Sequence, residues 1–210
     1  SGTDTDLGTT TIPSGTTSWS ITSSTLTAGS YDISAFQTVS SSDSPAATAL
    51  SVTIDNVAPT TPPAPNLDAA SDTGASDSDD ETNDTTPTFS GTAEALATVT
   101  VTSSIGGGLG STTADGSGNW SLTPGSALSD GSQDITVTAT DAAGNVSPAS
   151  TALSLVIDAT APTAPAVTGI TDDTGTSGSD GITSDTQLVF AGTAEANSTV
   201  EVFIDAGSIG

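Results

Sequence analysis

The chain has 210 residues, of which 25 are acidic and none is Lys, Arg or His, so its formal net charge is −25. Without a cationic side chain it cannot form an internal salt bridge or contact a phosphate, which makes nucleic acid and anionic membranes poor partners. It contains no Cys, which excludes disulfides, and its apolar runs of a few residues are too short to span a membrane.

Alternating apolar and polar residues predict strands in the first part of the chain. They occur at residues 19–21 (WSI), 31–36 (YDISAF) and 49–54 (ALSVTI), and a period of two is typical of strands with one buried face. Trp19 and Trp120 hold matching positions, and we expect both to pack in a core rather than to form sugar-stacking platforms. The proline-rich residues 56–65 predict a stiff, extended linker.

The central part of the chain carries the same pattern more completely. Strands are predicted at residues 86–92, 97–102, 134–140 and 152–158, with another that starts at Trp120 and a Gly-rich hairpin region at 105–119. No helical period of useful length occurs. Six or seven short strands in roughly 100 residues, separated by frequent turns, are typical of an antiparallel sandwich. The sequence therefore predicts an all-β fold.

A long internal repeat indicates how the chain is organised. Residues 73–95 return as residues 174–196, each ending in GTAEA, at an offset of 101 residues. Repetition at a fixed period is the mark of tandem modules. We predict the second half of a domain at residues 1–57, a complete domain at 58–160 and the first half of another at 161–210. The tail of 50 residues and the head of 57 would together form a unit of 107, against 103 for the complete one.

Three arrangements fit this division. The 210 residues could be one period of a longer covalent array, an arbitrary fragment, or a subunit whose half-domains complete those of other copies head to tail. No signal-peptide pattern occurs at Ser1, so an export signal would lie elsewhere, for example on a longer parent chain.

The composition does not favour catalysis. Without His, Cys or Lys, the usual general bases and activated nucleophiles are missing. Carboxylate pairs remain, as in glycosidases, but the acids lie in loops that repeat with the fold, which suits a structural role. We expect the protein not to be an enzyme.

Calcium binding is the chemistry that the acidic loops favour. Calcium takes six to eight oxygens from carboxylates, carbonyls and water. The first loop offers Asp72, Asp77, Asp79, Asp80, Glu81 and Asp84, and its repeat offers Asp172, Asp173, Asp180 and Asp185. Asp72 aligns with Asp173, Asp79 with Asp180, and Asp84 with Asp185. The spacing does not match an EF-hand, and the alternative is that Asp and Gly form solvated turns.

A second acidic group is expected at the domain junctions. In a sandwich of alternating strands, the loops after the second and sixth strands lie at the linker end, which would gather Asp55, Glu94, Asp141 and Asn145. At the next junction Asp158 and Glu195 occupy the matching places, whereas Thr38 and Ser42 replace Asp141 and Asn145 in the first part of the chain. The alternative for Glu94 and Asp141 is ordinary capping and turn formation.

Several motifs together resemble the bacterial immunoglobulin-like repeats of giant adhesins exported by type I secretion. They are IDNVAPTTP and IDATAPTAP at the linkers, the GTAEA turn, GNWSLTP at 118–124 and TATDAAGNVSPAS at 138–150. The resemblance implies a seven-stranded sandwich, calcium at the junctions and an extracellular location on the bacterial surface. By motif position it implies ligand roles for Asp55, Glu94, Asp141, Asp158 and the acids between Asp72 and Asp84.

The expected function is therefore a calcium-rigidified stalk that extends an adhesin's binding tip from the cell, with neighbouring repeats as its partners. The absence of Lys and Arg suggests a calcium-rich or saline setting and excludes lysine-based isopeptide cross-links. The alternatives are a self-assembling head-to-tail surface filament or sheath subunit and a carbohydrate-binding module.

Overall fold

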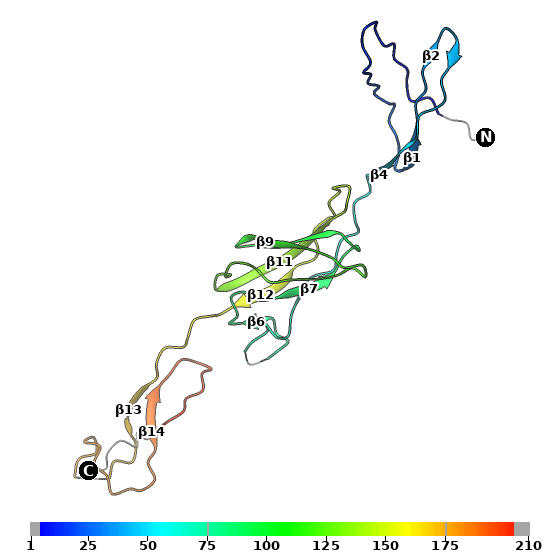
Figure 1. The fold of residues 1–210 in the computed structure, drawn as a ribbon. Coiled ribbons are helices and arrows are strands. Elements are labelled where there is room, and N and C mark those ends of the chain that lie inside the picture. The colour runs from blue at the N-terminus through cyan, green and yellow to red at the C-terminus, as the bar shows by residue number, and fades with distance from the viewer. Residues whose placement is uncertain (1–4, 75, 175, 204–210) are drawn as a thin grey trace. The chain divides into compact units, whose positions relative to one another are not determined.

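The computed structural model describes residues 5–74, 76–174 and 176–203 (Figure 1). The chain divides into two compact units, residues 1–158 and 159–210. The described residues form strands, turns and irregular segments but no helix, which confirms the predicted all-β class. None of these segments is therefore a helix that could cross a membrane.

The central domain is a sandwich of two sheets. One sheet has the order β10-β7-β5 and the other the order β6-β12-β11-β8-β9. The strands are β5 (Asn66–Leu67), β6 (Glu81–Thr82), β7 (Phe89–Thr92), β8 (Thr98–Ser103), β9 (Gly107–Thr113), β10 (Asn119–Leu122), β11 (Gly131–Thr140) and β12 (Leu153–Ile157). This arrangement of two packed β-sheets is that of an immunoglobulin-like sandwich.

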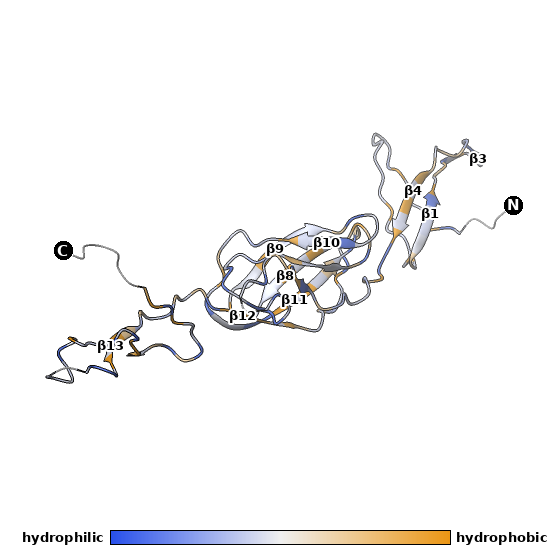
Figure 2. Cartoon of the chain, turned by 90° about the horizontal axis from the view of Figure 1, so that it is seen from below, coloured by the Kyte–Doolittle hydropathy of each residue, from blue (hydrophilic) through white to orange (hydrophobic). Residues whose placement is uncertain are grey.

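The core of the sandwich comes from the alternating residues that the sequence singles out. Val99 and Val101 of β8 and Ile135 and Val137 of β11 are buried between the sheets, whereas Thr100 and Thr136 between them are only partly buried. Figure 2 colours these strands by residue hydropathy. Phe89 of β7 is fully buried and packs in the same cluster. Each such side chain contributes ~1.5–3 kcal/mol through burial of apolar area.

One strand departs from the predicted antiparallel, seven-stranded pattern. β6 pairs parallel with the end of β12, with Glu81 opposite Val156 and Thr82 opposite Ile157. With β6 counted, the described part of the central domain has eight strands. The prediction failed here because β6 is only two residues long, and its neighbours are acidic loop residues with no alternating pattern.

The GTAEA turn is shaped by two close approaches. A Cβ on Gly91 would lie 2.8 Å from the Trp120 ring, so the glycine leaves room for the indole. Gly118 has φ +85°, and a Cβ there would lie 2.4 Å from the carbonyl oxygen of Ala93. The Ala93 N–H donates to the Gly118 carbonyl at 2.8 Å. These contacts fix the β7–β8 turn against β10.

Residues before the first linker form two antiparallel pairs of strands. β1 (Gly29–Ile33) pairs antiparallel with β4 (Leu50–Ile54), and β2 (Thr38–Val39) pairs with β3 (Ser42–Asp43). The predicted strand at residues 19–21 does not form, and Trp19 is 55% exposed. The expectation of a buried Trp19 is wrong because the matching strand β10 lies against β7, and residues 5–57 contain no counterpart of β7.

The second unit contains one antiparallel pair, β13 (Ala166–Ile170) with β14 (Phe190–Thr193). An acidic loop lies between these strands, as one lies between β5 and β7. The predicted tail-to-head join runs through residues 204–210 and 1–4, which lie outside the described residues.

Candidate metal-binding sites

The first acidic loop, residues 68–84, closes around one buried hydroxyl. Thr82 Oγ1 donates to the Ser71 carbonyl and accepts from the backbone N–H groups of Thr73 at 3.3 Å and Asp84 at 3.0 Å. The Thr73 hydroxyl lies 2.8 Å from the same oxygen and donates to Asn83 Oδ1 at 2.7 Å. The described residues of this loop, 68–74 and 76–84, are therefore held in a defined conformation by hydrogen bonds.

The second loop, residues 169–185, repeats this arrangement around Thr183. Thr183 Oγ1 donates to the Asp172 carbonyl at 3.2 Å and accepts from the N–H groups of Thr174 at 3.2 Å and Asp185 at 3.1 Å. The second unit has no described counterpart of β8–β12. The loop conformation therefore depends on its own sequence and not on a completed sandwich.

Each loop contains one carboxylate oxygen that is buried without a partner. Asp72 is 6% exposed; its Oδ2 accepts from the Asp80 N–H at 3.4 Å, and its Oδ1 is buried with no hydrogen bond. Asp173 matches it, with Oδ2 accepting from the Gly181 N–H at 3.0 Å and Oδ1 left alone. A buried carboxylate oxygen without a partner is costly, and a cation would satisfy it.

Negative charge is concentrated around Asp72. Asp80 is half-buried; its burial raises its pKa, and the charges of Asp72 and Asp79 raise that pKa further. Asp79 Oδ1 accepts from the Glu81 N–H at 3.2 Å, as Asp180 Oδ1 accepts from the Ile182 N–H at 3.0 Å. The repulsion among these carboxylates is not offset by a positive side chain, because the chain has no Lys, Arg or His.

The remaining loop acids lie further from this group or form local turns. Asp84 Oδ1 accepts from the Thr86 N–H at 2.9 Å, and Asp185 Oδ1 accepts from the Gln187 N–H at 3.0 Å. Asp77 is exposed. In the part of the chain that the structure describes, no three acidic side chains surround a common point. An ion at Asp72 would therefore take most of its oxygens from carbonyls and water.

The first loop lies at the end of the central domain from which the second linker leaves. The Val156 N–H donates to the Asp80 carbonyl at 3.0 Å, and the Asp158 N–H donates to the Thr82 carbonyl at 2.9 Å. Asp158 is the residue at which the predicted second junction begins. The acidic loop is thus tied to the outgoing linker, a placement that the sequence pattern did not indicate.

The opposite end of the central domain brings together three of the four predicted junction residues. Thr140 pairs with Thr98, which places the turns after β7 and β11 at one end, as predicted. Asn145 Nδ2 donates to Asp141 Oδ2 at 2.8 Å and to the backbone carbonyl of Asp55 at 3.2 Å. The first linker therefore contacts this turn. The side-chain amide of Asn145, followed by backbone N–H groups of the turn, lowers the pKa of Asp141.

The predicted glutamates lie in the GTAEA turns. Glu94 is exposed, and its carbonyl accepts from the Ala97 N–H at 3.1 Å. Glu195 Oε2 accepts from the Thr163 N–H of the second linker at 3.2 Å. In the second unit, therefore, the glutamate of this motif accepts a hydrogen bond from the linker. The ligand roles of Glu94, Glu195, Asp55 and Asp158 stay predictions.

One acidic turn was missed in the sequence. Asp115 Oδ1 accepts from the N–H groups of Ser117 at 2.8 Å and Asn119 at 2.9 Å. Those bonds, first of all the one from the Asn119 N–H, lower the pKa of Asp115. The same D-x-x-G-N pattern occurs at residues 141–145 and 115–119, so comparing the two segments would have revealed it. The carboxylates of Asp115 and Asp141 both accept hydrogen bonds from residues of their own turns.

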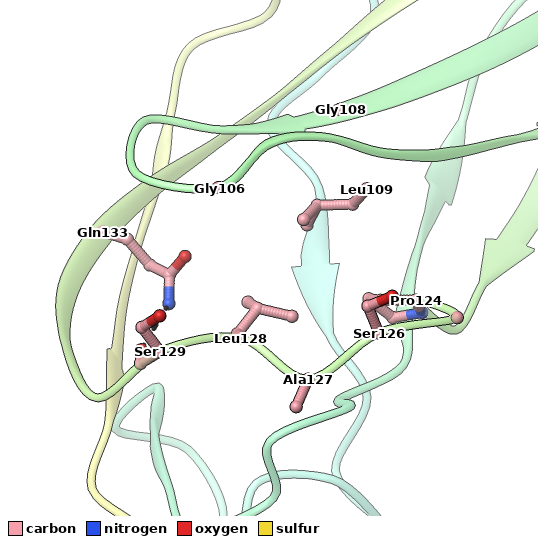
Figure 3. A pocket seen from close by; sticks show the side chains of 10 residues that line it. Gly106, Gly108, Leu109, Pro124, Ser126, Ala127, Leu128, Ser129 and Gln133 are labelled. Carbon is pink, nitrogen blue, oxygen red and sulfur yellow. Dashed lines mark hydrogen bonds between the residues drawn. The ribbon is translucent and has the colours of Figure 1, made fainter.

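A cavity lies between the β8–β9 turn and the segment before β11 (Figure 3). Its lining includes Leu109, Pro124, Leu128 and Gln133 but no ionisable residue. Gln133 Oε1 accepts from Ser103 Oγ at 2.6 Å, and its Nε2 donates to the Ser129 carbonyl at 3.3 Å. The amide of Gln133 is thus already paired within the domain, and the other polar side chains of the lining are the hydroxyls of Ser126 and Ser129.

Residues 59–159 match the family model of the bacterial Ig-like domain. No curated protein matches the chain. The matched segment spans the linker prolines and both sheets, so the central unit is similar to bacterial Ig-like domains. Such domains are generally non-catalytic structural modules of extracellular or surface proteins.

Proposed function

We propose that this chain is a repeat segment of a bacterial surface adhesin, in which tandem Ig-like domains form a calcium-stiffened stalk that holds a binding tip away from the cell. The observation that carries the proposal is the buried, unpaired oxygen of Asp72 and its repeat at Asp173. Both lie in loops of the same conformation, in a chain of net charge −25 that has no cation of its own.

Calcium suits these loops on chemical grounds. All the side-chain donors that they present are oxygens, from carboxylates, hydroxyls and carbonyls, which are the ligands that a hard cation prefers. Asp72 would be the central ligand, with Asp79 and Asp80 nearby. The second loop has Gly178, Gly181 and Ile182 in place of Asp77, Asp80 and Glu81. Its lower charge gives it a weaker attraction for the ion, so we expect two classes of site.

The placement of the first loop explains how an ion would stiffen the junction. The loop holds the end of β12 and Asp158 through the bonds from Val156 and Asp158 to its carbonyls. An ion that locks the loop would therefore restrict the linker where it leaves the domain, and would reduce the repulsion that otherwise pushes neighbouring domains apart. Each sandwich would lengthen the stalk by roughly 40 Å, since strands rise ~3.3 Å per residue and loops add to them.

The test is a calcium titration followed by thermal unfolding of the chain. Extracellular calcium modules bind with Kd ~10⁻⁴–10⁻³ M, so about 10 mM calcium should stabilise the folded form by about 1.5–2.5 kcal/mol. That corresponds to a rise in Tm of about 10 °C for a domain of this size. Sodium chloride at the same ionic strength should give a much smaller rise, because it screens charge without binding.

Two isosteric variants make the test specific. Asp72→Asn should lose most of the calcium-dependent rise in Tm. Asp134→Asn removes the same charge from an exposed strand position in the same domain, and its bond from Ser154 Oγ can be kept by an amide oxygen. It should therefore respond to calcium like the unmodified chain. Equal responses of all three proteins would remove the support for an ion at Asp72.

A further inference from the structure

We propose that the turn at residues 141–145 is the docking site for the linker that enters the central domain, and that the side-chain amide of Asn145 holds this linker without a metal ion. The occupant is the first linker, residues 55–65 of this chain. The contact lies at the opposite end of the domain from the acidic loop of Asp72, so it goes beyond the stalk proposal and does not depend on calcium.

The Asn145 amide has an acceptor for each of its two hydrogens. Its nitrogen donates to Asp141 Oδ2 at 2.8 Å and to the backbone carbonyl of Asp55 at 3.2 Å. The reverse orientation of the amide would place its oxygen against two oxygens that have no hydrogen to donate. The contact with the linker therefore requires the donor nitrogen of the Asn side chain.

Asp141 fixes the position of that amide. In addition to the bond from the amide, its Oδ1 accepts from the backbone N–H groups of Ala143 at 2.8 Å and Asn145 at 2.9 Å. A cation bound to this carboxylate would compete with these donors, and a donor that loses its partner is costly. The turn is therefore suited to present an amide, whereas the unpaired oxygen of Asp72 is suited to an ion.

The linker has the conformation of a segment that docks along one face. Pro59, Pro62 and Pro65 are buried, whereas the residues between them are exposed. A period of three is that of the polyproline II helix, whose backbone makes no internal hydrogen bonds and can therefore accept from a neighbour. The bond from Asn145 to the Asp55 carbonyl fixes the linker before the first buried proline.

The repeat position of Asp55 is also bound from the other side. Asp158 holds this place in the second linker, and its N–H donates to the Thr82 carbonyl of the acidic loop at 2.9 Å. In a linker between two complete domains, the domain that the chain leaves would bind the N–H of this residue, and the domain that it enters would bind its carbonyl. Since only the first contact belongs to an acidic loop, only that one should strengthen with calcium.

The test uses the absence of Cys from the chain, which allows spin labels to be attached at two introduced cysteines. Val57→Cys lies in the first linker and Thr102→Cys on β8, and both positions are exposed. Double electron–electron resonance of the 210-residue chain measures the distribution of distances between the two labels. We expect a narrow distribution in chelator that calcium leaves unchanged. Because the result is obtained in chelator, it does not depend on whether the acidic loops bind an ion.

Matched variants identify the latch. Asn145→Ala should broaden the distribution in chelator and in calcium alike, because residues 55–58 lose their anchor while the buried prolines keep the rest of the linker in place. Asn145→Ser, which introduces the residue found at the matching Ser42, should broaden it as well, since a hydroxyl has one hydrogen to donate instead of two. Asn119→Ala is the control. Within the described residues the Asn119 amide bonds only to Asp115, in a turn of the same D-x-x-G-N pattern, so this variant should keep the narrow distribution.

Thermal unfolding of each variant checks that the sandwich is folded before the distances are compared. A distribution that is broad in chelator and narrows only with calcium would indicate that an ion holds the first linker, and would overturn the proposal. Equal widths for Asn145→Ala and Asn119→Ala would overturn it as well, because the contact with Asp55 would then have no effect of its own.

Discussion

Asp80 occupies a backbone conformation that its counterpart in the second loop fills with glycine. Its φ is +59°, against +74° for Gly181, and Asp tolerates this left-handed region less well than Gly does. Burial and the charges of Asp72 and Asp79 raise its pKa. Both effects oppose the folded state when no cation is present, so the residue is a local cost that a bound ion would offset.

The pH dependence of this cost follows from the direction of the shift. At low pH Asp80 is protonated in both states and has no electrostatic effect. As pH rises above 3.8, the unfolded chain releases its proton first, and the folded form is progressively penalised until pH exceeds the raised pKa. In chelator at neutral pH, Asp80→Asn should therefore stabilise the protein by about 0.5 kcal/mol, the size of a partly exposed charge pair.

Urea unfolding of the variant and the unmodified chain at several pH values would check this prediction. The difference in free energy of unfolding should be near zero at about pH 3 and reach its full size by neutral pH. Asp77→Asn, an exposed change in the same loop, serves as the control and should show little pH-dependent gain. A gain in the free energy of unfolding that is independent of pH would indicate that the substitution only relieves the backbone strain at residue 80.

At the scale of the element, the acidic loops are local structures organised by threonine. The Thr82 hydroxyl joins the Ser71 carbonyl to the Thr73 and Asp84 N–H groups while 3% exposed. Thr82→Val keeps the shape but leaves those backbone groups buried without partners, at about 1–3 kcal/mol for each. We expect a loss of about 3 kcal/mol in the free energy of unfolding.

Thr82→Ser is the matched control for this prediction. It keeps the hydroxyl and removes one methyl group, so it should cost about 1 kcal/mol. Chemical denaturation of both variants would measure the two values. If valine and serine at position 82 proved equally stable, the hydroxyl would not be what holds the loop.

Sequence reasoning succeeded where burial follows a simple period and failed where it depends on a distant partner. The strands with Val99, Val101, Ile135 and Val137 were predicted because one face of each is apolar. Trp19 has the same local pattern as Trp120, but it stays exposed without a counterpart of β7. Local sequence cannot specify whether a partner strand is present.

The same distinction applies to the residues of the candidate metal-binding sites. The acids of the two loops were found by composition and repeat matching, and the junction of Asp141 and Asn145 with the first linker by alternation of strand direction. That Asp72 is the buried acid was not predictable, because its burial results from the Thr82-centred closure of the loop. The parallel pairing of β6 with β12, which brings the loop to Asp158, likewise depends on tertiary structure.

At the scale of the whole molecule, a charge of −25 makes the behaviour in solution depend on which cations are present. Sodium ions screen repulsion, whereas a bound calcium ion would also restrict the linkers. We therefore expect small-angle scattering in calcium to indicate a stiffer particle than in chelator with sodium chloride at equal ionic strength. A normalised Kratky curve should fall further at high angle in calcium. Superimposable curves would contradict the stiffening.

The parallel pair of β6 and β12 has a mechanical consequence. Tension between the two linkers acts first on β5 and its pairing with β7. Once β5 has separated, the tension pulls β6 from its N-terminal side and β12 from its C-terminal side, in opposite directions along two parallel strands. The hydrogen bonds from Val156 to Asp80 and from Asp158 to Thr82 then bear the load together in shear, rather than opening one after another as in a peeled hairpin. Rupture under force depends on the unfolding barrier rather than on equilibrium stability, and we expect the parallel pairing of β6 with β12 to place that barrier at the acidic loop.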